Sequence, residues 1–415
     1  MTSMPMRIPN HMSVSPEYSA RAKTAAVPLS KIIEPRLANY NFVMGPGLTG
    51  LLNLGSTCYI NACVQILAHM PELYVAMSNG YKIRENSFNS CRETAVATEW
   101  LKLYARQWKP ASTSATAPSV HSPNTFIRVI HHVAKETHHE LETTYAEHDV
   151  PEFLQFIIDC LHKSISREVE FTIKGTPGSP LDNIAVECYK LIQNLYTKEY
   201  SEVWSLLYGV HIMEFHDLHT GEFVTRNYEP YFTIQLPLPL PASSNTHRMM
   251  ASNIAGTQLN TQPPQNRTVS LLDCFDMFSS GEVLEKYVDS ETRLDMDVVQ
   301  TTIFWSLPTI MVIQLKRFSS IFKKTKTHVD FPVAGLDLSS YVIGYSKEKC
   351  VYDLIGVCNH SGELRGGHYF SYVKHAGNGR WYCFNDSDVR EIDESKIVTY
   401  RAYILFYKRS ASASM

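Results

Sequence analysis

The spacing of hydrophobic and polar residues divides the chain into a helical first half and a strand-rich second half. Up to about residue 200, apolar residues recur at the spacing of amphipathic helices. The pattern predicts helices over residues 57–70, 92–108, 124–138, 151–165 and 185–196. From about residue 208, alternating patterns broken by Pro, Gly and Asn favour strands. Helices followed by strands predict an α+β fold rather than a doubly wound parallel sheet.

Three segments lack this periodicity. Residues 1–45 mix Met, Ser, Pro and scattered charge, which predicts a flexible N-terminal tail. Residues 241–267 are polar and predict a long mobile insertion. Residues 409–415 predict a short C-terminal tail. The pattern of the second half predicts strands within residues 229–240, 309–318, 350–360, 366–375 and 380–386.

Composition and charge narrow the class of protein. The net charge of −3 provides no general attraction to nucleic acid or anionic lipid, so we expect neither as a partner. The longest apolar run, residues 303–315, is too short to span a membrane. The N-terminus lacks the apolar core of a signal peptide, and the 9 cysteines form no C-x-x-C pair. We therefore expect a soluble protein with free thiols in the cytoplasm, the nucleus or both.

Cys58 is a candidate nucleophile because it lies at the start of the first predicted helix. Ser56 or Thr57 can cap this helix. A thiol in the first turn lies near the positive end of the helix macrodipole, which favours the nucleophilic thiolate. The alternative is that Cys58 is one more small core residue. Cys63 lies inside the helix, about 140° around it, and is assigned to the core.

A base for this nucleophile is predicted from a hairpin in the last third of the chain. The turn "KHAGNGR" separates two aromatic-rich strands. A turn centred near residues 376–377 places His368 directly opposite Asn385, so both side chains point to the same face. Gly366 and Gly367 precede the histidine and allow another backbone to approach closely. The alternative is a surface ribbon with an incidental histidine.

These stretches resemble the ubiquitin-specific protease family of papain-like cysteine isopeptidases. The segment "GLLNLGSTCYINACVQIL" resembles the cysteine box of the family, and "GGHYFSYVK…RWYCFNDSDV" resembles its histidine box. Further similar blocks lie between them in the same order: "EHDVPEFLQFIIDCLH", "YEPYFTIQLPLP", "SLLDCFDMF", "LPTIMVIQLKRF" and "VDFPVAGLDLSSY". Colinear blocks over residues 47–408 are stronger evidence than a single motif.

The resemblance implies a fold and roles for individual residues. The fold would be a right hand of thumb, palm and fingers. The catalytic domain would span residues 46–408, with fingers over roughly 200–305. By this analogy Cys58 attacks the carbonyl of the C-terminal glycine of ubiquitin, and His368 moves the protons. The analogy makes Asn385 the group that orients the imidazole, Asn53 the donor to the oxyanion, and Asp386 an assistant or substitute for Asn385.

The resemblance also places two acidic residues at the site that binds the ubiquitin tail. Asp149 and Glu152 precede an apolar helix, where Asp-x-x-Glu would form a capping box. In the family, acidic residues at these positions bind the arginine-bearing tail of ubiquitin, so both roles remain open. Gly366 and Gly367 are counted with them as substrate-binding residues. Glu147 and His148 replace the two glutamines of the family.

Other expectations concern metal, partners and rival functions. Many family members hold zinc with two C-x-x-C pairs, but this chain has "HDLH" and "DSET" instead, so we expect no metal and no cofactor. The expected partners are ubiquitin and ubiquitinated proteins, with the chain as a monomer. The alternatives are a catalytically silent ubiquitin-binding scaffold, an isopeptidase for another ubiquitin-like modifier, and an unrelated acyltransferase.

Overall fold

The computed structural model describes residues 17–19, 47–83, 89–108, 119–137, 149–239, 269–288, 295–318, 324–347, 350–363 and 367–410. The expected insertion and most of the expected tails lie outside these residues. Within the expected N-terminal tail, strand β1 (Glu17–Ser19) pairs antiparallel with β4 (Glu170–Thr172), so this part is ordered by pairing. No described helix has the length and apolar composition needed to cross a lipid bilayer.

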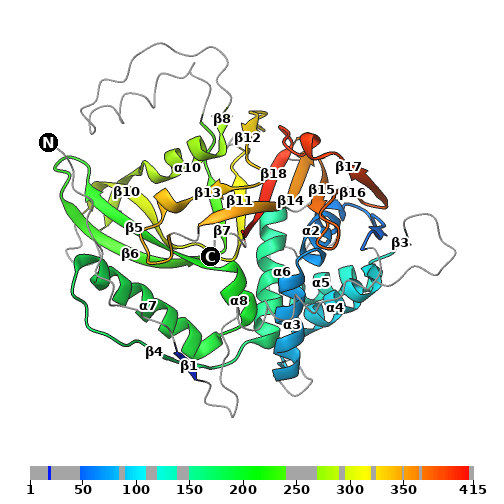
Figure 1. The fold of residues 1–415 in the computed structure, drawn as a ribbon, viewed down its shortest axis with the longest axis horizontal. Coiled ribbons are helices and arrows are strands. Elements are labelled where there is room, and N and C mark those ends of the chain that lie inside the picture. Colours follow the sequence, from blue (N-terminus) through cyan, green and yellow to red (C-terminus); the bar gives the residue numbers. More distant parts are fainter. Residues whose placement is uncertain are drawn as a thin grey trace.

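Helices form most of the first half of the chain, as predicted (Figure 1). They are α2 (Cys58–Ala68), α3 (Pro71–Ile83), α4 (Thr94–Gln107), α5 (Asn124–Glu136), α6 (Val150–Ile165), α7 (Pro180–Glu199), α8 (Glu202–Leu207) and, later, α10 (Leu271–Ser279). The pattern missed α3, which contains Gly80, a poor helix former. A Cβ atom at Gly80 would lie 2.7 Å from side-chain atoms of Ile165, so close packing of α3 on α6 explains the glycine.

The second half forms a large palm sheet. Its strands are β7 (Thr233–Leu236), β11 (Ile310–Leu315), β13 (Leu336–Asp337), β14 (Val351–Ser361), β15 (His368–Lys374), β16 (Trp381–Asn385), β17 (Asp388–Ile392) and β18 (Ala402–Arg409). Their order is β17-β16-β15-β14-β18-β11-β7, with β13 paired to β14. Only β11 and β7 pair in parallel within this sheet.

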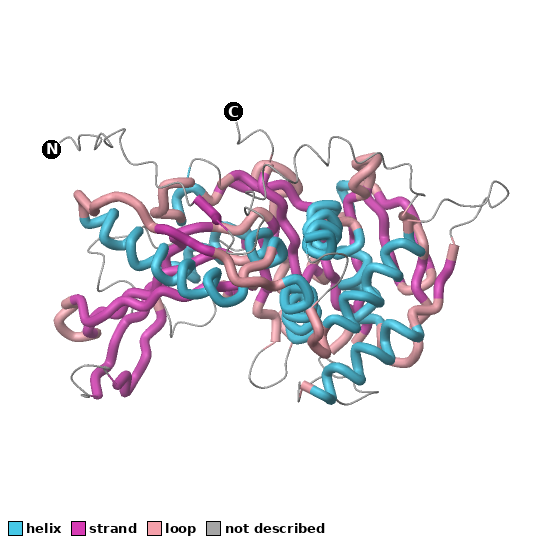
Figure 2. Tube along the Cα trace, turned by 90° about the horizontal axis from the view of Figure 1, so that it is seen from below, coloured by secondary structure: helices cyan, strands magenta, loops and turns pink. Residues whose placement is uncertain are grey.

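A separate antiparallel sheet forms the fingers. Its strands are β5 (Gly209–Asp217), β6 (Phe223–Tyr231), β9 (Glu282–Val288) and β10 (Asp295–Ser306), in the order β6-β5-β10-β9. In the perpendicular view these strands project from the body of the molecule (Figure 2). Short pairs join other segments: β2 (Gly50–Leu51) with β3 (Val120–His121), and β8 (Val269–Ser270) with β12 (Val329–Asp330). Two 3-10 turns complete the described elements: Ser339–Tyr341 and Glu394–Lys396.

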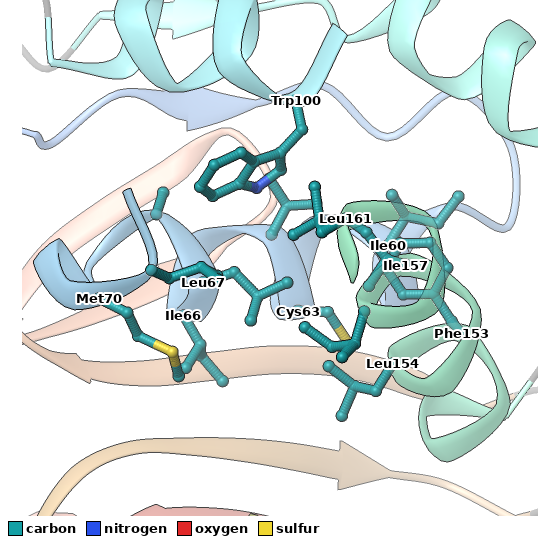
Figure 3. Packing of buried hydrophobic residues seen from close by; sticks show 14 of the residues in the cluster. Ile60, Cys63, Ile66, Leu67, Met70, Trp100, Phe153, Leu154, Ile157 and Leu161 are labelled. Atoms are coloured by element: carbon teal, nitrogen blue, oxygen red, sulfur yellow. The ribbon is translucent and has the colours of Figure 1, made fainter. Parts of the chain in front are cut away.

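The palm sheet separates two hydrophobic cores because side chains alternate between its faces. In β18, Ile404 and Phe406 join the core on the helical side, whereas Leu405 and Tyr407 join the core on the other side. Every residue of α2 is buried in the helical core. Figure 3 shows side chains of this helix beside Trp100 of α4 and beside Phe153, Leu154, Ile157 and Leu161 of α6. The central position of α2 fixes the place of Cys58 relative to the palm.

Candidate active site

Cys58 is the first residue of α2 and is 4% exposed. Thr57 occupies the N-cap position, as predicted, but its side chain makes no capping hydrogen bond. Its Oγ1 instead accepts from the N–H of Leu54 at 2.9 Å. The helix therefore begins at the thiol without a side-chain cap, and the partial positive charge of the helix end lies beside the sulfur.

The hairpin of β15 and β16 brings a base and its orienting amide together. His368 is the first residue of β15 and Asn385 is the last residue of β16. His368 Nε2 lies 2.6 Å from Asn385 Oδ1. His368 also hydrogen-bonds the side chain of Cys58. Because Asn385 occupies Nε2, Nδ1 is the ring nitrogen left for the sulfur. Hydrogen bonds thus connect Cys58, His368 and Asn385 in series. Cys58 lies far from the other two residues in the sequence.

The predicted register of this hairpin is wrong by two residues. The strands pair Ser371 with Phe384, so Asn385 is not directly opposite His368. The turn closes one residue later than expected, between residues 375 and 380, where the N–H of the first donates to the carbonyl of the last at 2.8 Å. A two-residue shift keeps side chains on the same face, so His368 and Asn385 still meet as diagonal neighbours.

The electrostatics of the site favour a protonated imidazole. The hydrogen bond to Cys58 is the main cause that raises the pKa of His368 to about 9, against the opposing effect of burial. The hydrogen bond to Asn385 and the negative charge of Asp386 act in the same direction as Cys58. A doubly protonated ring can donate from Nε2 to Asn385 and from Nδ1 to the sulfur at the same time.

Asn53 lies on the exposed loop before α2, and hydrogen bonds fix the orientation of its amide. Its Oδ1 accepts from the N–H groups of Gly55 at 3.1 Å and Thr57 at 3.2 Å. Its Nδ2 donates to Asp386 Oδ2 at 3.1 Å. Since the oxygen is held by the loop and one amide hydrogen by Asp386, the second hydrogen of Nδ2 remains to donate to a group bound near Cys58.

Asp386 holds two amides rather than the imidazole. Besides Asn53, its carboxylate accepts from Asn61 Nδ2 at 2.8 Å. Its backbone carbonyl accepts from the N–H of Leu51 at 2.9 Å. Asp386 adopts a left-handed conformation with φ of 51°, which Asp tolerates better than most residues. The orienting contact to His368 comes from Asn385, and the expected substitution by Asp386 is not observed.

Asn61 is a site residue that the sequence patterns did not indicate. It lies in the first turn of α2 and is 2% exposed, and it joins Asp386 to the carbonyls of Leu51 and Leu52 at 3.4 and 3.3 Å. The signal available was an amide in a largely apolar helix, which contains one further amide at Gln65. Buried polar side chains need hydrogen-bond partners, which makes such a position worth attention.

Asp149 caps α6 and bridges the helices and the palm. Its Oδ1 accepts from the N–H of Val150 at 2.9 Å, instead of from the amide three residues into the helix that a capping box requires. The hydroxyls of Tyr369 and Tyr403 donate to the same carboxylate at 3.0 and 2.6 Å. Burial raises the pKa of Asp149, and these tyrosines oppose the shift. Glu152 is exposed in the first turn of α6.

Of the two glycines, Gly366 lies outside the described residues, as do Glu147 and His148. A Cβ atom at Gly367 would lie 2.0 Å from Nε2 of His360. The predicted close approach of a backbone occurs at the carbonyl oxygen of Glu363, 3.0 Å from the same Cβ position, and the His360 ring lies closer still.

Comparisons with known proteins place the chain in a family. The family model described as Ubiquitin carboxyl-terminal hydrolase matches residues 49–407. The chain belongs to this family. It is 28% identical over 424 residues to Ubiquitin carboxyl-terminal hydrolase 2 of Rattus norvegicus, covering 99% of this chain and 63% of the relative. The relative of the same name in Homo sapiens is 28% identical over 393 residues, covering 93% and 59%. This ubiquitin carboxyl-terminal hydrolase chain thus spans slightly less than two thirds of these relatives.

Solved structures share the fold of this ubiquitin carboxyl-terminal hydrolase chain. The SAGA DUB module bound to monoubiquitin aligns with a TM-score of 0.59 at 21% identity, covering 88% of this chain and 69% of that chain. The SAGA DUB module bound to ubiquitin aldehyde aligns with a TM-score of 0.60 at 22% identity, covering 88% and 70%. The predicted α+β fold of the papain-like type is therefore confirmed.

The finger sheet is held by aromatic packing. Phe215 stacks on Tyr287 across the sheet with ring centroids 4.9 Å apart, and His216 meets Phe223 edge-on at 5.8 Å. No group of three or more His, Cys, Asp or Glu among the described residues is arranged to hold a metal ion. The aligned pair Asp289 and Thr292 lies outside those residues. His219 lies in an exposed turn.

Proposed function

We propose that this chain hydrolyses the peptide or isopeptide bond after the C-terminal glycine of ubiquitin and so releases ubiquitin from conjugated proteins. The observation that carries the proposal is the hydrogen-bonded line of Cys58, His368 and Asn385 in a member of this hydrolase family. Neighbouring solved structures of the same fold are bound to monoubiquitin and ubiquitin aldehyde.

The proposed mechanism has two steps. Cys58 Sγ, with its proton already held by His368, bonds to the glycine carbonyl carbon, and the resulting oxyanion accepts from Asn53 Nδ2. The C–N bond breaks as His368 donates its proton to the departing amine. Water then attacks the thioester, loses a proton to His368 and releases the glycine carboxylate, and the thiol is restored. One oxyanion donor of this kind contributes about 3 kcal/mol to lowering the barrier.

Substrate recognition is assigned to residues on the acyl side of Cys58. Asp149 and Glu152 supply negative charge for the cationic tail, with Glu152 the more exposed of the two. Gly366 and Gly367 are assigned to substrate binding from the resemblance to the family. We also propose that residues 46–408 act as one catalytic domain, as a monomer without cofactor, metal, nucleic acid or membrane, in the cytoplasm, the nucleus or both.

The test uses ubiquitin that carries an electrophile at its C-terminus. Wild-type protein and the Cys63→Ala variant should form a covalent adduct, and Cys58→Ala should not. Cys63 is a matched control because it lies in the same helix but is fully buried. An adduct that persists in Cys58→Ala overturns the assignment of the nucleophile. Ubiquitin binding without an adduct indicates a silent scaffold, and reaction only with another modifier indicates a different substrate.

A further inference from the structure

A buried lysine and a buried histidine lie behind the active site, outside the catalytic line. Lys324 is 6% exposed and His360 is 1% exposed. Lys324 Nζ donates to the backbone carbonyl of His360 at 2.7 Å and lies 2.8 Å from its Nδ1. An ammonium group can only donate, so Nδ1 of His360 accepts and the ring proton resides on Nε2. Lys324 thereby fixes both the tautomer and the ring plane of His360.

Burial of the Lys324 and His360 side chains is energetically unfavourable. Burial lowers the pKa of Lys324 to about 8, and nearby cations, Arg317 first among them, add to the effect. Within the described part of the chain, the ammonium group donates two hydrogen bonds to His360 and none to a carboxylate. Burial likewise lowers the pKa of His360 to about 4, with the charges of Lys324 and His368 adding to it. A buried cation whose acceptors among the described residues are all neutral contributes little to stability, which favours a functional role.

The His360 ring packs against the start of the strand that carries the catalytic base. The sheet register pairs His360 with Tyr369 and the next residue, Ser361, with His368. The rings of His360 and Tyr369 lie 4.6 Å apart. Nε2 of His360 would be 2.0 Å from a Cβ atom at Gly367. The ring therefore fills the space beside the backbone on both sides of His368.

We propose that Lys324 and His360 form a positioning pair for His368. Lys324 fixes the orientation of the His360 ring. The ring in turn fixes the position of the backbone from Gly367 to Tyr369. This backbone position directs the His368 imidazole toward Cys58. Neither residue touches the reacting atoms. The proposal rests on the proposed function, because the consequence of misplacing His368 is a slower reaction with the thiol.

The test compares Lys324→Met with Lys326→Met in the full chain. Lys326 is a matched control because it is an exposed lysine on the same segment, paired with Glu363 at 3.9 Å. With a fluorogenic ubiquitin C-terminal amide, Lys324→Met should lower kcat about tenfold and change KM less than about twofold, since orientation is lost and binding is kept. Lys326→Met should change neither. Lys324→Gln retains one donor for Nδ1 and should fall between them, and it serves as the readout if Lys324→Met does not fold.

A second readout does not require activity. In ¹⁵N–¹H spectra of the histidine side chains, wild-type His360 should show the Nε2–H tautomer, and Lys324→Met should lose this preference and shift the signals of His368. Unchanged tautomer and His368 signals in folded Lys324→Met, or a wild-type kcat, overturn the positioning pair. If wild-type protein cleaves no ubiquitin substrate, the proposed function fails instead, while the spectra still decide whether Lys324 orients His360.

Discussion

Asn53 donates a hydrogen bond to Asp386 at 3.1 Å, although 333 positions separate the two residues in the chain. Asp386 also receives the amide of Asn61, so the loop before the nucleophile and the end of the palm hairpin share one carboxylate. The group proposed to stabilise the oxyanion is therefore oriented from the turn that directly follows Asn385. Asp386 therefore orients the oxyanion donor by hydrogen bonds and acts on the base through its negative charge.

Substitution of Asp386 should act through Asn53. Asp386→Asn keeps a residue that tolerates the left-handed backbone but can accept only at its single oxygen, so we expect kcat to fall by about tenfold to a hundredfold. Asn53→Ala should cost about a hundredfold. The double variant should lose little more than Asn53→Ala alone, as measured by single-turnover kinetics in a double-mutant cycle. Additive losses would contradict a shared path.

The pKa of His368 should depend on Cys58. Because the contact with Cys58 is the main cause that raises this pKa to about 9, Cys58→Ala should move it toward its usual value near 6.5. NMR titration of the His368 ring gives the measurement, with Cys63→Ala as the control. In wild-type protein the stabilisation from this contact is fully present below pH 6.5 and is lost as the pH rises through about 9. An unchanged pKa in Cys58→Ala would disprove the contact.

Substitutions of Asp149 and Glu152 should have different effects. Substitution of Glu152 should mainly affect substrate recognition, whereas substitution of Asp149 should also affect stability. Glu152 is exposed, so Glu152→Gln should raise KM for a ubiquitin substrate severalfold with little change in melting temperature. Asp149→Asn breaks the contacts to Tyr369 and Tyr403 and should also lower the free energy of unfolding by about 1–3 kcal/mol. Thermal melts and steady-state kinetics on both variants give the comparison. Equal effects on stability would refute this division.

Acid should destabilise the protein through His69. This residue is 5% exposed, donates from Nδ1 to the carbonyl of Gln65 at 2.7 Å and packs against Trp108 and His375. Burial lowers its pKa to about 3, so the unfolded chain binds the proton first, and stability declines as the pH falls below 6.5. This one group should remove about 2 kcal/mol between pH 6.5 and 5.

The variant His69→Leu tests this pH dependence. Its free energy of unfolding, measured with urea at several pH values, should vary less over the acidic range than that of wild-type protein. His132→Leu, at an exposed position, is the control and should leave the slope unchanged. If the free energy of unfolding of His69→Leu falls with acid as steeply as that of wild-type protein, other groups, such as His360, cause the effect.

Chelators should leave the fingers intact. With Phe215 and Tyr287 stacked across the sheet, neither EDTA nor added zinc should change the melting temperature or the activity. Tyr287→Ala should lower the free energy of unfolding by about 0.5–1.5 kcal/mol beyond its loss of buried area. A drop in melting temperature with EDTA would show that this expectation is wrong.

Local structure could be predicted well from the sequence, whereas contacts between distant elements could be predicted only in part. Helix periodicity located α2, and alternation on two aromatic strands placed His368 and Asn385 on one face despite a wrong register. That error was harmless because only an odd shift exchanges the faces of a strand. The hydrogen bonds of Asp386 could not be foreseen, because they depend on a left-handed backbone and on the distance between two separate elements. The Lys324–His360 contact was invisible for the same reason.

Helix α2 has no solvent-facing side. It packs between the helical layer and the palm sheet, so a shift of the Cys58 sulfur toward His368 would disturb both layers. Any adjustment between thiol and imidazole must come from the hairpin of β15 and β16, which lies between β14 and the edge strand β17 in the palm sheet. Differences in turnover among relatives should therefore arise mainly from the residues that support this hairpin, while the position of the nucleophile stays the same.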